Sequence, residues 1–172
     1  YLEDGAAGLM IPHVSTPEKA QMLVDAVKFP PLGDRGLDGA GLDCDFIHSG
    51  GPTYPGEAND ETFLVVQIET IEAVRNVDAI AAVKGVDALF VGPGDLGLRL
   101  KHQSGDLTLQ QAYETVAAAA KKHGKAWGCP AMSPEDLKVK HDLGARLINH
   151  GGEFGAIMKM LEANVADFDG LS

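Results

Sequence analysis

The sequence predicts an α/β fold, a (β/α)8 (TIM) barrel of which this chain carries the C-terminal five βα units. Short apolar strands alternate with amphipathic helices at intervals of about 20–40 residues, a pattern typical of right-handed βαβ units in a parallel sheet. Polar residues gather where the strands end, which is where barrel enzymes place their chemistry. No GxGxxG turn follows the first strand, and this weakens the competing fold, an open doubly wound sheet.

Five segments are expected to form the strands. Each is short and rich in apolar residues, as parallel strands covered by helices are. They span residues 8–14, 63–69, 88–93, 125–131 and 146–151. A complete barrel needs eight units and about 250 residues, so roughly three units are expected to lie upstream of Tyr1.

Start and stop signals predict the helices between those strands. Pro17 and Pro134 each follow a Ser or Thr cap and take the first helical position. Apolar residues recur at three-residue steps from Ile71 to Val83 and form one stripe. Residues 109–124 end in cationic side chains and a glycine, and residues 153–168 are expected to form the last helix.

One segment breaks this rhythm. Residues 29–62 are dense in Gly, Pro and Asp and carry no helical or strand period. A loop of this length in a compact domain is usually functional or mobile. We therefore expect residues 1–172 to form a single domain with an irregular loop at about 29–62, much of it away from the site or at a subunit contact.

Composition excludes several classes of partner. The formal net charge is −11, which argues against nucleic acid because phosphate binding needs a basic face. No apolar run approaches the ~20 residues of a membrane span. Cys44 and Cys129 lie far apart without metal-type spacing, which favours a reduced, cytoplasmic setting.

Two carboxylates are expected to meet at the top of the barrel. Side chains alternate along a strand, so Val65, Gln67 and Glu69 share the face that points toward the barrel axis. The next strand runs into "GPGDLG", which places Asp95 just beyond its C-terminal end. Because neighbouring parallel strands lie about 4.8 Å apart, Glu69 and Asp95 can reach one ion.

A divalent cation would remove the repulsion between two buried carboxylates this close. Hard oxygen ligands without a His or Cys partner favour Mg²⁺ or Mn²⁺. The alternative is that Glu69 starts a helix near the positive end of its dipole and Asp95 lies in an Asx-turn. The glycine-rich turn could still hold a substrate carboxylate on its backbone amides.

The segment "VVQIETIEAVRNVDAIAAVKGVDALFVGPGDLG", residues 65–97, resembles the metal-binding core of the HpcH/HpaI aldolases, which are class II pyruvate aldolases. The segments "GAAGLMIPHVSTPEKA" and "KFPPLGDRGLDGAG" are also similar to that family. Together they cover most of the chain, and the combination is more specific than any one motif.

The resemblance implies a metal-dependent aldolase that cleaves or forms 4-hydroxy-2-oxo acids through a pyruvate enolate. Glu69 and Asp95 would bind Mg²⁺, Mn²⁺ or Co²⁺, and Gln67 would orient a bound water or ligand. The backbone amides of Gly94 and Asp95 would receive the carboxylate of a pyruvate-like 2-oxo acid, whose partner is an aldehyde. Members of the family form hexamers, which implies a homo-oligomer here.

The family's catalytic histidine and its keto-acid-binding arginine have no counterpart in this chain and are expected upstream of Tyr1. The chain as given is therefore expected to lack essential residues. Alternatives are a citrate-lyase-β-like acyl-CoA lyase, which would need a basic path for CoA, and a macrophomate-synthase-like decarboxylase. A non-catalytic alternative is a truncated, inactive assembly subunit.

Other polar residues receive simpler interpretations. Arg35 matches an arginine in the family's loop and is expected to anchor that loop through an ion pair. His13 and His150 are interpreted as strand-end histidines, and a role in substrate contact is the less favoured alternative for each. Cys129 is expected to be a small packing residue because no motif marks it as a nucleophile, and Trp127 is assigned to the core or pocket wall.

Overall fold

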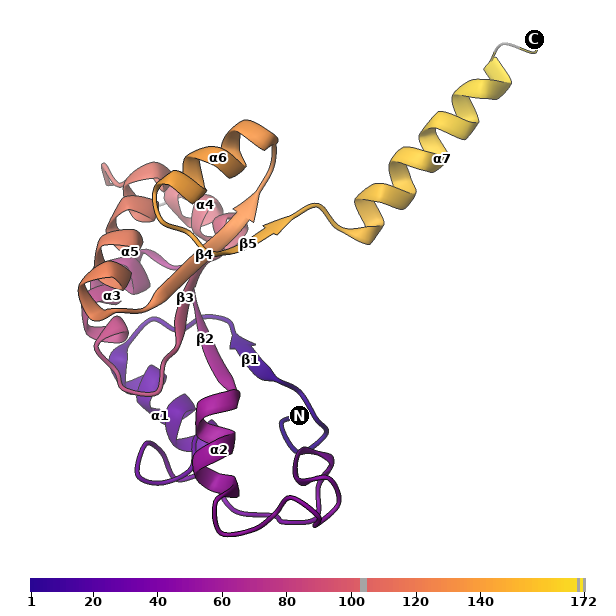
Figure 1. Ribbon diagram of the computed structural model, residues 1–172. Coiled ribbons are helices and arrows are strands. Elements are labelled where there is room, and N and C mark those ends of the chain that lie inside the picture. The colour runs from indigo at the N-terminus through magenta and orange to yellow at the C-terminus, as the bar shows by residue number, and fades with distance from the viewer. Residues whose placement is uncertain (103–104, 170, 172) are drawn as a thin grey trace.

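A computed structural model of the chain describes residues 1–102, 105–169 and 171. Five parallel strands form one curved sheet in which each strand pairs with the next along the chain (Figure 1). The strands are β1 (Gly8–Ile11), β2 (Phe63–Ile68), β3 (Ala88–Val91), β4 (Ala126–Ala131) and β5 (Leu147–His150). This partial barrel confirms the predicted fold class and all five predicted strands.

Most of the helices cover the outer, convex face of the sheet (Figure 1). The helices are α1 (Pro17–Val27), α2 (Tyr54–Glu61), α3 (Ile71–Ala81), α4 (Pro93–His102), α5 (Leu109–His123), α6 (Pro134–Asp142) and α7 (Glu153–Asp169). Four of them begin at a capping hydroxyl that accepts a backbone N–H, as the predicted start signals require. These caps are Thr16, Thr70, Thr108 and Ser133.

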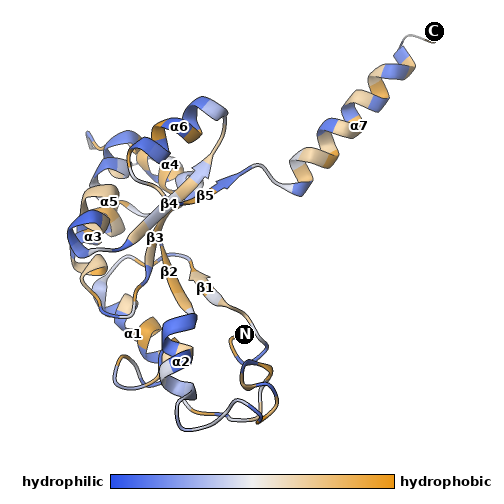
Figure 2. Cartoon of the chain, in the orientation of Figure 1, coloured by the Kyte–Doolittle hydropathy of each residue, from blue (hydrophilic) through white to orange (hydrophobic). Residues whose placement is uncertain are grey.

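The two faces of β2 carry the alternation that the sequence predicts. Leu64, Val66 and Ile68 are fully buried in the main core between the sheet and the helices. Val65 lies on the concave face, where it forms a separate small cluster with Ala88 and Phe90. Figure 2 shows the hydrophobic β2 directly after the hydrophilic α2. The same alternation directs the side chains that follow Val65 at two-residue steps toward the barrel axis.

Two of the observed helices correct the predictions. The loop predicted for residues 29–62 contains a short 3₁₀ helix (Leu42–Cys44) and ends in α2, whose buried residues are only Tyr54 and Ala58. With eight residues and two buried positions, α2 has almost no periodic signal. The glycine-rich turn expected at "GPGDLG" is the first turn of a helix, because α4 begins at Pro93 and its Leu96 is fully buried.

The segment before α2 is held by an ion pair, as predicted for Arg35. Its Nη2 lies 2.6 Å from Asp43 Oδ2, and the hydroxyl of Tyr54 donates to the same carboxylate. The guanidinium of Arg35 also stacks over the ring of Phe29, 4.5 Å from the ring centroid. The buried Lys28 donates to the carbonyl of Thr62 at the start of β2. This assembly therefore lies at the N-terminal end of the sheet, away from the strand ends that carry the polar residues.

Protonation of Asp43 is expected to destabilise the fold. Burial alone would raise the pKa of Asp43, but hydrogen bonds from Tyr54 and Arg35 outweigh it and hold the pKa below its usual range. A folded-state pKa below the unfolded value contributes stability above about pH 4, and that contribution disappears as the pH falls through the folded value. Asp43→Asn should therefore lower the unfolding free energy near neutral pH, and the deficit should shrink below about pH 4.

Urea unfolding of the intact protein between pH 3 and 7 would measure this deficit. Asp60→Asn is the matched control, since Asp60 is an exposed acid on α2 of the same assembly. A deficit for Asp43→Asn that stayed constant across the whole pH range would contradict the assigned role of its carboxylate.

Helix α7 projects away from the sheet at the C-terminal end of the chain (Figure 1). Its large apolar side chains are exposed and recur at three- and four-residue steps, which places them on one stripe of the helix. The stripe consists of Phe154, Ile157, Met158, Leu161, Val165 and Phe168, and the exposed Met160 lies beside it. None of the helices in the described part of the chain is both long and apolar enough to cross a membrane.

Candidate metal centre

Glu69 follows the last residue of β2 and is almost fully buried, with 6% of its surface exposed. The next residue, Thr70, caps α3, and its hydroxyl also pairs with that of Ser15 at 2.8 Å. Glu69 Oε1 accepts the backbone N–H of His13 at 2.7 Å. The carboxylate is therefore fixed at the junction of a strand, a helix cap and the segment after β1.

Asp95 lies in the first turn of α4, immediately after β3. The Arg99 side chain, one turn further along α4, has Nη1 3.5 Å from Asp95 Oδ1. The same nitrogen donates to the backbone carbonyls of Glu69 and Asp95 at 3.4 and 3.2 Å. Arg99 thus holds the two acidic residues in one arrangement. Arg99 is not among the residues predicted for the site, although its spacing of four residues from Asp95 is the usual signal for a helical ion pair.

The structure brings a histidine between these carboxylates. His13 Nδ1 lies 3.4 Å from Glu69 Oε1, and His13 Nε2 lies 3.5 Å from Asp95 Oδ2. The sequence alone predicts His13 to be a strand-end residue and the two carboxylates to have no His partner, so this contact is a correction. The register explains the contact, because Ile11 pairs with Val66 and the chain therefore reaches His13 beside the end of β2.

Gln67 and Gly94 lie near this cluster in different ways. Gln67 is on the concave face, where its Nε2 lies 3.0 Å from Met10 Sδ. Gly94 is in the first turn of α4, where the backbone N–H groups of a helix lack intrahelical acceptors and favour an anion. A Cβ added at Gly94 would find nothing within 4 Å, so this side of the turn is open.

The donor atoms fit a divalent cation. One ligand atom from each of His13, Glu69 and Asp95 lies within 4.8 Å of the others. Two carboxylates and an imidazole are a donor set that Mn²⁺ and its neighbours in the first transition row accept. A cation among them would also offset the repulsion between the two acidic groups.

Only a glycine at position 92 leaves room for the side chain of Glu69. A Cβ at position 92 would lie 2.6 Å from Glu69 Oε2 and 3.0 Å from Glu69 Cβ. Gly92→Ala is therefore expected to displace the carboxylate and weaken Mn²⁺ binding by about 10–100-fold, the range typical of disturbed support for a metal ligand. Isothermal titration of the intact protein would measure it, with Gly97→Ala as control because position 97 has open space. Equal affinity in both variants would contradict this packing.

The other candidate residues lie elsewhere. Cys129 is fully buried in the main core, and burial raises the pKa of its thiol to about 11. It is therefore protonated at neutral pH and is a packing residue, as predicted. Trp127 belongs to the same core. His150 Nδ1 lies 3.0 Å from the carbonyl of Ala131, at the ends of β4 and β5.

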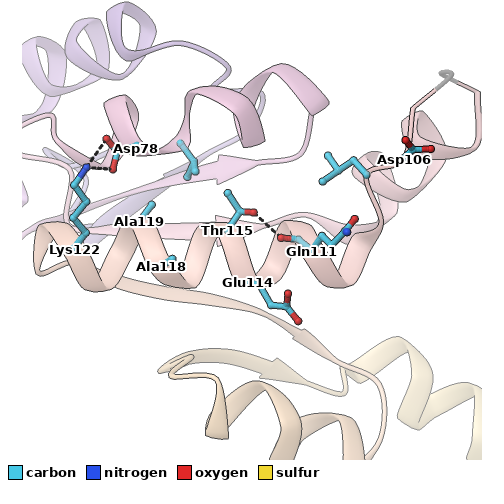
Figure 3. Close-up of a pocket in the computed structure, with 10 residues that line it drawn as sticks. Asp78, Asp106, Gln111, Glu114, Thr115, Ala118, Ala119 and Lys122 are labelled. Atoms are coloured by element: carbon cyan, nitrogen blue, oxygen red, sulfur yellow. Dashed lines mark hydrogen bonds and ion pairs between the residues drawn. The ribbon is translucent and has the colours of Figure 1, made fainter.

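A broad hollow of about 850 Å³ lies on the outer helical layer, between α3, α5 and the segment before α5 (Figure 3). At one end Lys122 forms an ion pair with Asp78 at 2.7 Å, and Asp106 lies at the other end. Its floor is made of α5 side chains such as Ala118 and Ala119. None of the cluster residues lines this hollow, so it is separate from the candidate metal centre.

The fold and the cluster together define a class of protein. The acidic residues follow adjacent parallel strands of a partial (β/α)8 barrel, at the edge where barrel enzymes carry their active sites. The chain therefore has a partial (β/α)8 barrel fold, with its candidate site at the C-terminal ends of β2 and β3.

Comparison with known proteins identifies the family. The model of the HpcH/HpaI aldolase/citrate lyase family matches residues 1–158, and the chain belongs to this family. It is 40% identical over 157 residues to a 4-hydroxy-2-oxovalerate aldolase of Novosphingobium aromaticivorans, covering 87% of this chain and 57% of that protein. It is 34% identical over 169 residues to a 2-keto-3-deoxy-L-rhamnonate aldolase of Klebsiella pneumoniae subsp. pneumoniae, covering 97% of this chain and 63% of that protein.

A solved structure shows the same fold. The chain superposes on an HpcH/HpaI aldolase from Desulfitobacterium hafniense DCB-2 with a TM-score of 0.81 and 32% identity. The match covers 97% of this chain and 66% of that one. The chain thus spans about three fifths of the length of the relatives that it matches.

Proposed function

We propose that the whole protein is a divalent-metal-dependent aldolase that cleaves or forms 4-hydroxy-2-oxo acids. One observation carries the proposal: Glu69 and Asp95 follow adjacent strands and present their carboxylates to one point at the catalytic edge of the barrel. The names of the relatives support the reaction class, since the two described above are called a 2-keto-3-deoxy-L-rhamnonate aldolase and a 4-hydroxy-2-oxovalerate aldolase.

The residues of this chain have distinct tasks in that reaction. Glu69 and Asp95 would hold the cation, and Arg99 fixes both residues through the contacts described above. The backbone amides of Gly94 and Asp95, at the start of α4, would bind the carboxylate of the keto acid. Gln67, on the concave face, would orient a bound water or ligand. When bound, the cation supplies positive charge that stabilises the enolate developing as the carbon–carbon bond breaks.

The substrates proposed for the whole protein are a pyruvate-like 2-oxo acid and an aldehyde. This chain covers only part of the relatives' length, and we assign the general base and the arginine that holds the keto acid to the rest of the barrel. The aldehyde would be selected by pocket walls that include those other units. The buried free thiols of Cys44 and Cys129 suit a reducing compartment, and the proposal places the protein in the cytoplasm.

The proposal includes a homo-oligomer, with a hexamer as the expected form. The apolar stripe of α7 supports it, because contiguous exposed apolar surface usually marks a protein interface. A second copy of the chain would cover this stripe in the assembly.

The test of the reaction is pyruvate release. The intact protein, freed of metal with a chelator, would be incubated with 4-hydroxy-2-oxo acids with and without added Mn²⁺. Cation-dependent release of pyruvate together with the matching aldehyde is expected. Cleavage that proceeds at the same rate without any cation would overturn the metal dependence, and no cleavage of any such acid would overturn the reaction class.

A further inference from the structure

We infer that His13 supplies a ring nitrogen as a third protein ligand to the cation at Glu69 and Asp95, giving a centre that prefers transition-metal ions over Mg²⁺. The inference rests on the proposed function, since it requires a cation at those two carboxylates. It goes further by naming a ligand and a class of metal.

The position of the imidazole is the first argument. Its two nitrogens face one carboxylate each, at 3.4 Å from Glu69 and 3.5 Å from Asp95. Charge-assisted N–H···O bonds are shorter, at about 2.7–2.9 Å. The ring therefore lies between the two carboxylates without a close hydrogen bond to either of them. A single cation could bind a ring nitrogen together with both carboxylates.

The backbone of His13 is the second argument. Its φ of +56° lies in the left-handed region, which is uncommon for a residue other than glycine. Its N–H donates to Glu69 Oε1 at 2.7 Å, and its carbonyl accepts from Lys19 Nζ at 2.9 Å. The next residue, Val14, donates to the carbonyl of Gln67 at 3.3 Å. Surrounding groups thus impose an unfavourable conformation, and such conformations cluster at functional sites.

The chemical consequence concerns which metal binds. Carboxylate and water ligands suit Mg²⁺ and Mn²⁺ alike, whereas imidazole suits the first-row transition metals. With a half-exposed His13 added to Glu69 and Asp95, the centre gains one nitrogen donor while staying open on the solvent side. The affinity for Mn²⁺ should therefore exceed that for Mg²⁺ by more than the two carboxylates alone would give.

Pulsed electron paramagnetic resonance of Mn²⁺ bound to the intact protein tests the ligand directly. A histidine nitrogen on the ion gives a strong ¹⁴N coupling, which should change to the ¹⁵N pattern when the protein is grown with ¹⁵N-labelled histidine. The coupling should vanish in His13→Asn, a substitution chosen because asparagine tolerates positive φ. It should persist in His150→Asn, the control at another strand end.

Affinities provide a second readout. His13→Asn should lose at least about tenfold in Mn²⁺ affinity, because even mutation of a residue that only supports a metal ligand typically costs about 10–100-fold. The loss in Mg²⁺ affinity should be smaller. If Mn²⁺ bound through Glu69 and Asp95 without any histidine coupling, the role of His13 would be disproved and the proposed function would stand. If Mn²⁺ failed to bind the unaltered protein, the metal centre of the proposed function would itself be wrong.

Discussion

Replacement of Glu69 by glutamine is expected to abolish cation-dependent cleavage in the intact protein. The substitution keeps the size of the side chain and its ability to accept the N–H of His13, but it removes one of the two negative charges offered to the cation. Losing preorganised stabilisation of developing charge typically costs about 10²–10³-fold in kcat. Loss of the cation as well should place the variant at or beyond the upper end of that range.

Asp95→Asn should have a similar effect through the other carboxylate. The two variants should also lose Mn²⁺ binding in titration calorimetry, which separates a failed metal site from a failed chemical step. Asp106→Asn is the control, because Asp106 lines the hollow on the outer helical layer and carries the same charge change. Full turnover in both Glu69→Gln and Asp95→Asn would show that the assigned ligands are wrong.

Most of the sheet could be predicted because its signals are local. In β2, aliphatic residues alternate with residues of the concave face, and Thr70 then caps the next helix, so the position of Glu69 at the strand end follows from sequence alone. The same holds for α5, where a capping box at Thr108 and a left-handed Gly124 mark both ends. Each of these features depends on residues within one or two turns of each other.

The missed elements depend on distant partners. Helix α2 is stabilised by contacts of Tyr54 with Phe29 and Asp43, which come from an irregular segment earlier in the chain. Helix α4 contains two glycines in its first five residues, Gly94 and Gly97, and Gly92 comes directly before it. These glycines lower its local helix propensity. Its burial of Leu96 under the sheet is what holds it. No local pattern contains either contact.

The candidate site shows the same division. The proximity of Glu69 and Asp95 could be inferred from alternation and the spacing of adjacent strands, both regular properties of a sheet. The approach of His13 could not, because its backbone takes a positive φ to donate to Glu69. That conformation is decided by a hydrogen bond between residues 56 positions apart.

Gly128→Ala is expected to cause a larger loss of stability than any other glycine-to-alanine change in the described strands. Gly128 lies within β4 and pairs with Leu147 of β5. A Cβ at this position would lie 1.7 Å from the carbonyl oxygen of Leu147 and 2.6 Å from its carbonyl carbon. Backbone atoms cannot rotate away as a side chain can, so the two strands would have to separate or change register.

Overpacking of a core usually costs about 1–3 kcal/mol, and occasionally more. A collision with paired backbone should reach at least the top of that range, about 3 kcal/mol, which corresponds to a fall in Tm of roughly 6–12 °C for a domain of this size. Thermal unfolding of the intact protein would measure the shift. Hydrogen exchange at the amides of β4 and β5 would show whether the loss is centred on their pairing.

The matched control is Gly56→Ala on α2. Position 56 has nothing within 4 Å of an added Cβ, and alanine is favoured over glycine within a helix by about 0.5–1 kcal/mol. This variant should therefore be slightly stabilised, although the chemical change is the same. A Gly128→Ala protein as stable as the unaltered one would mean that β4 and β5 do not approach each other as closely as described. The edge of the sheet at β5 would then need a different pairing.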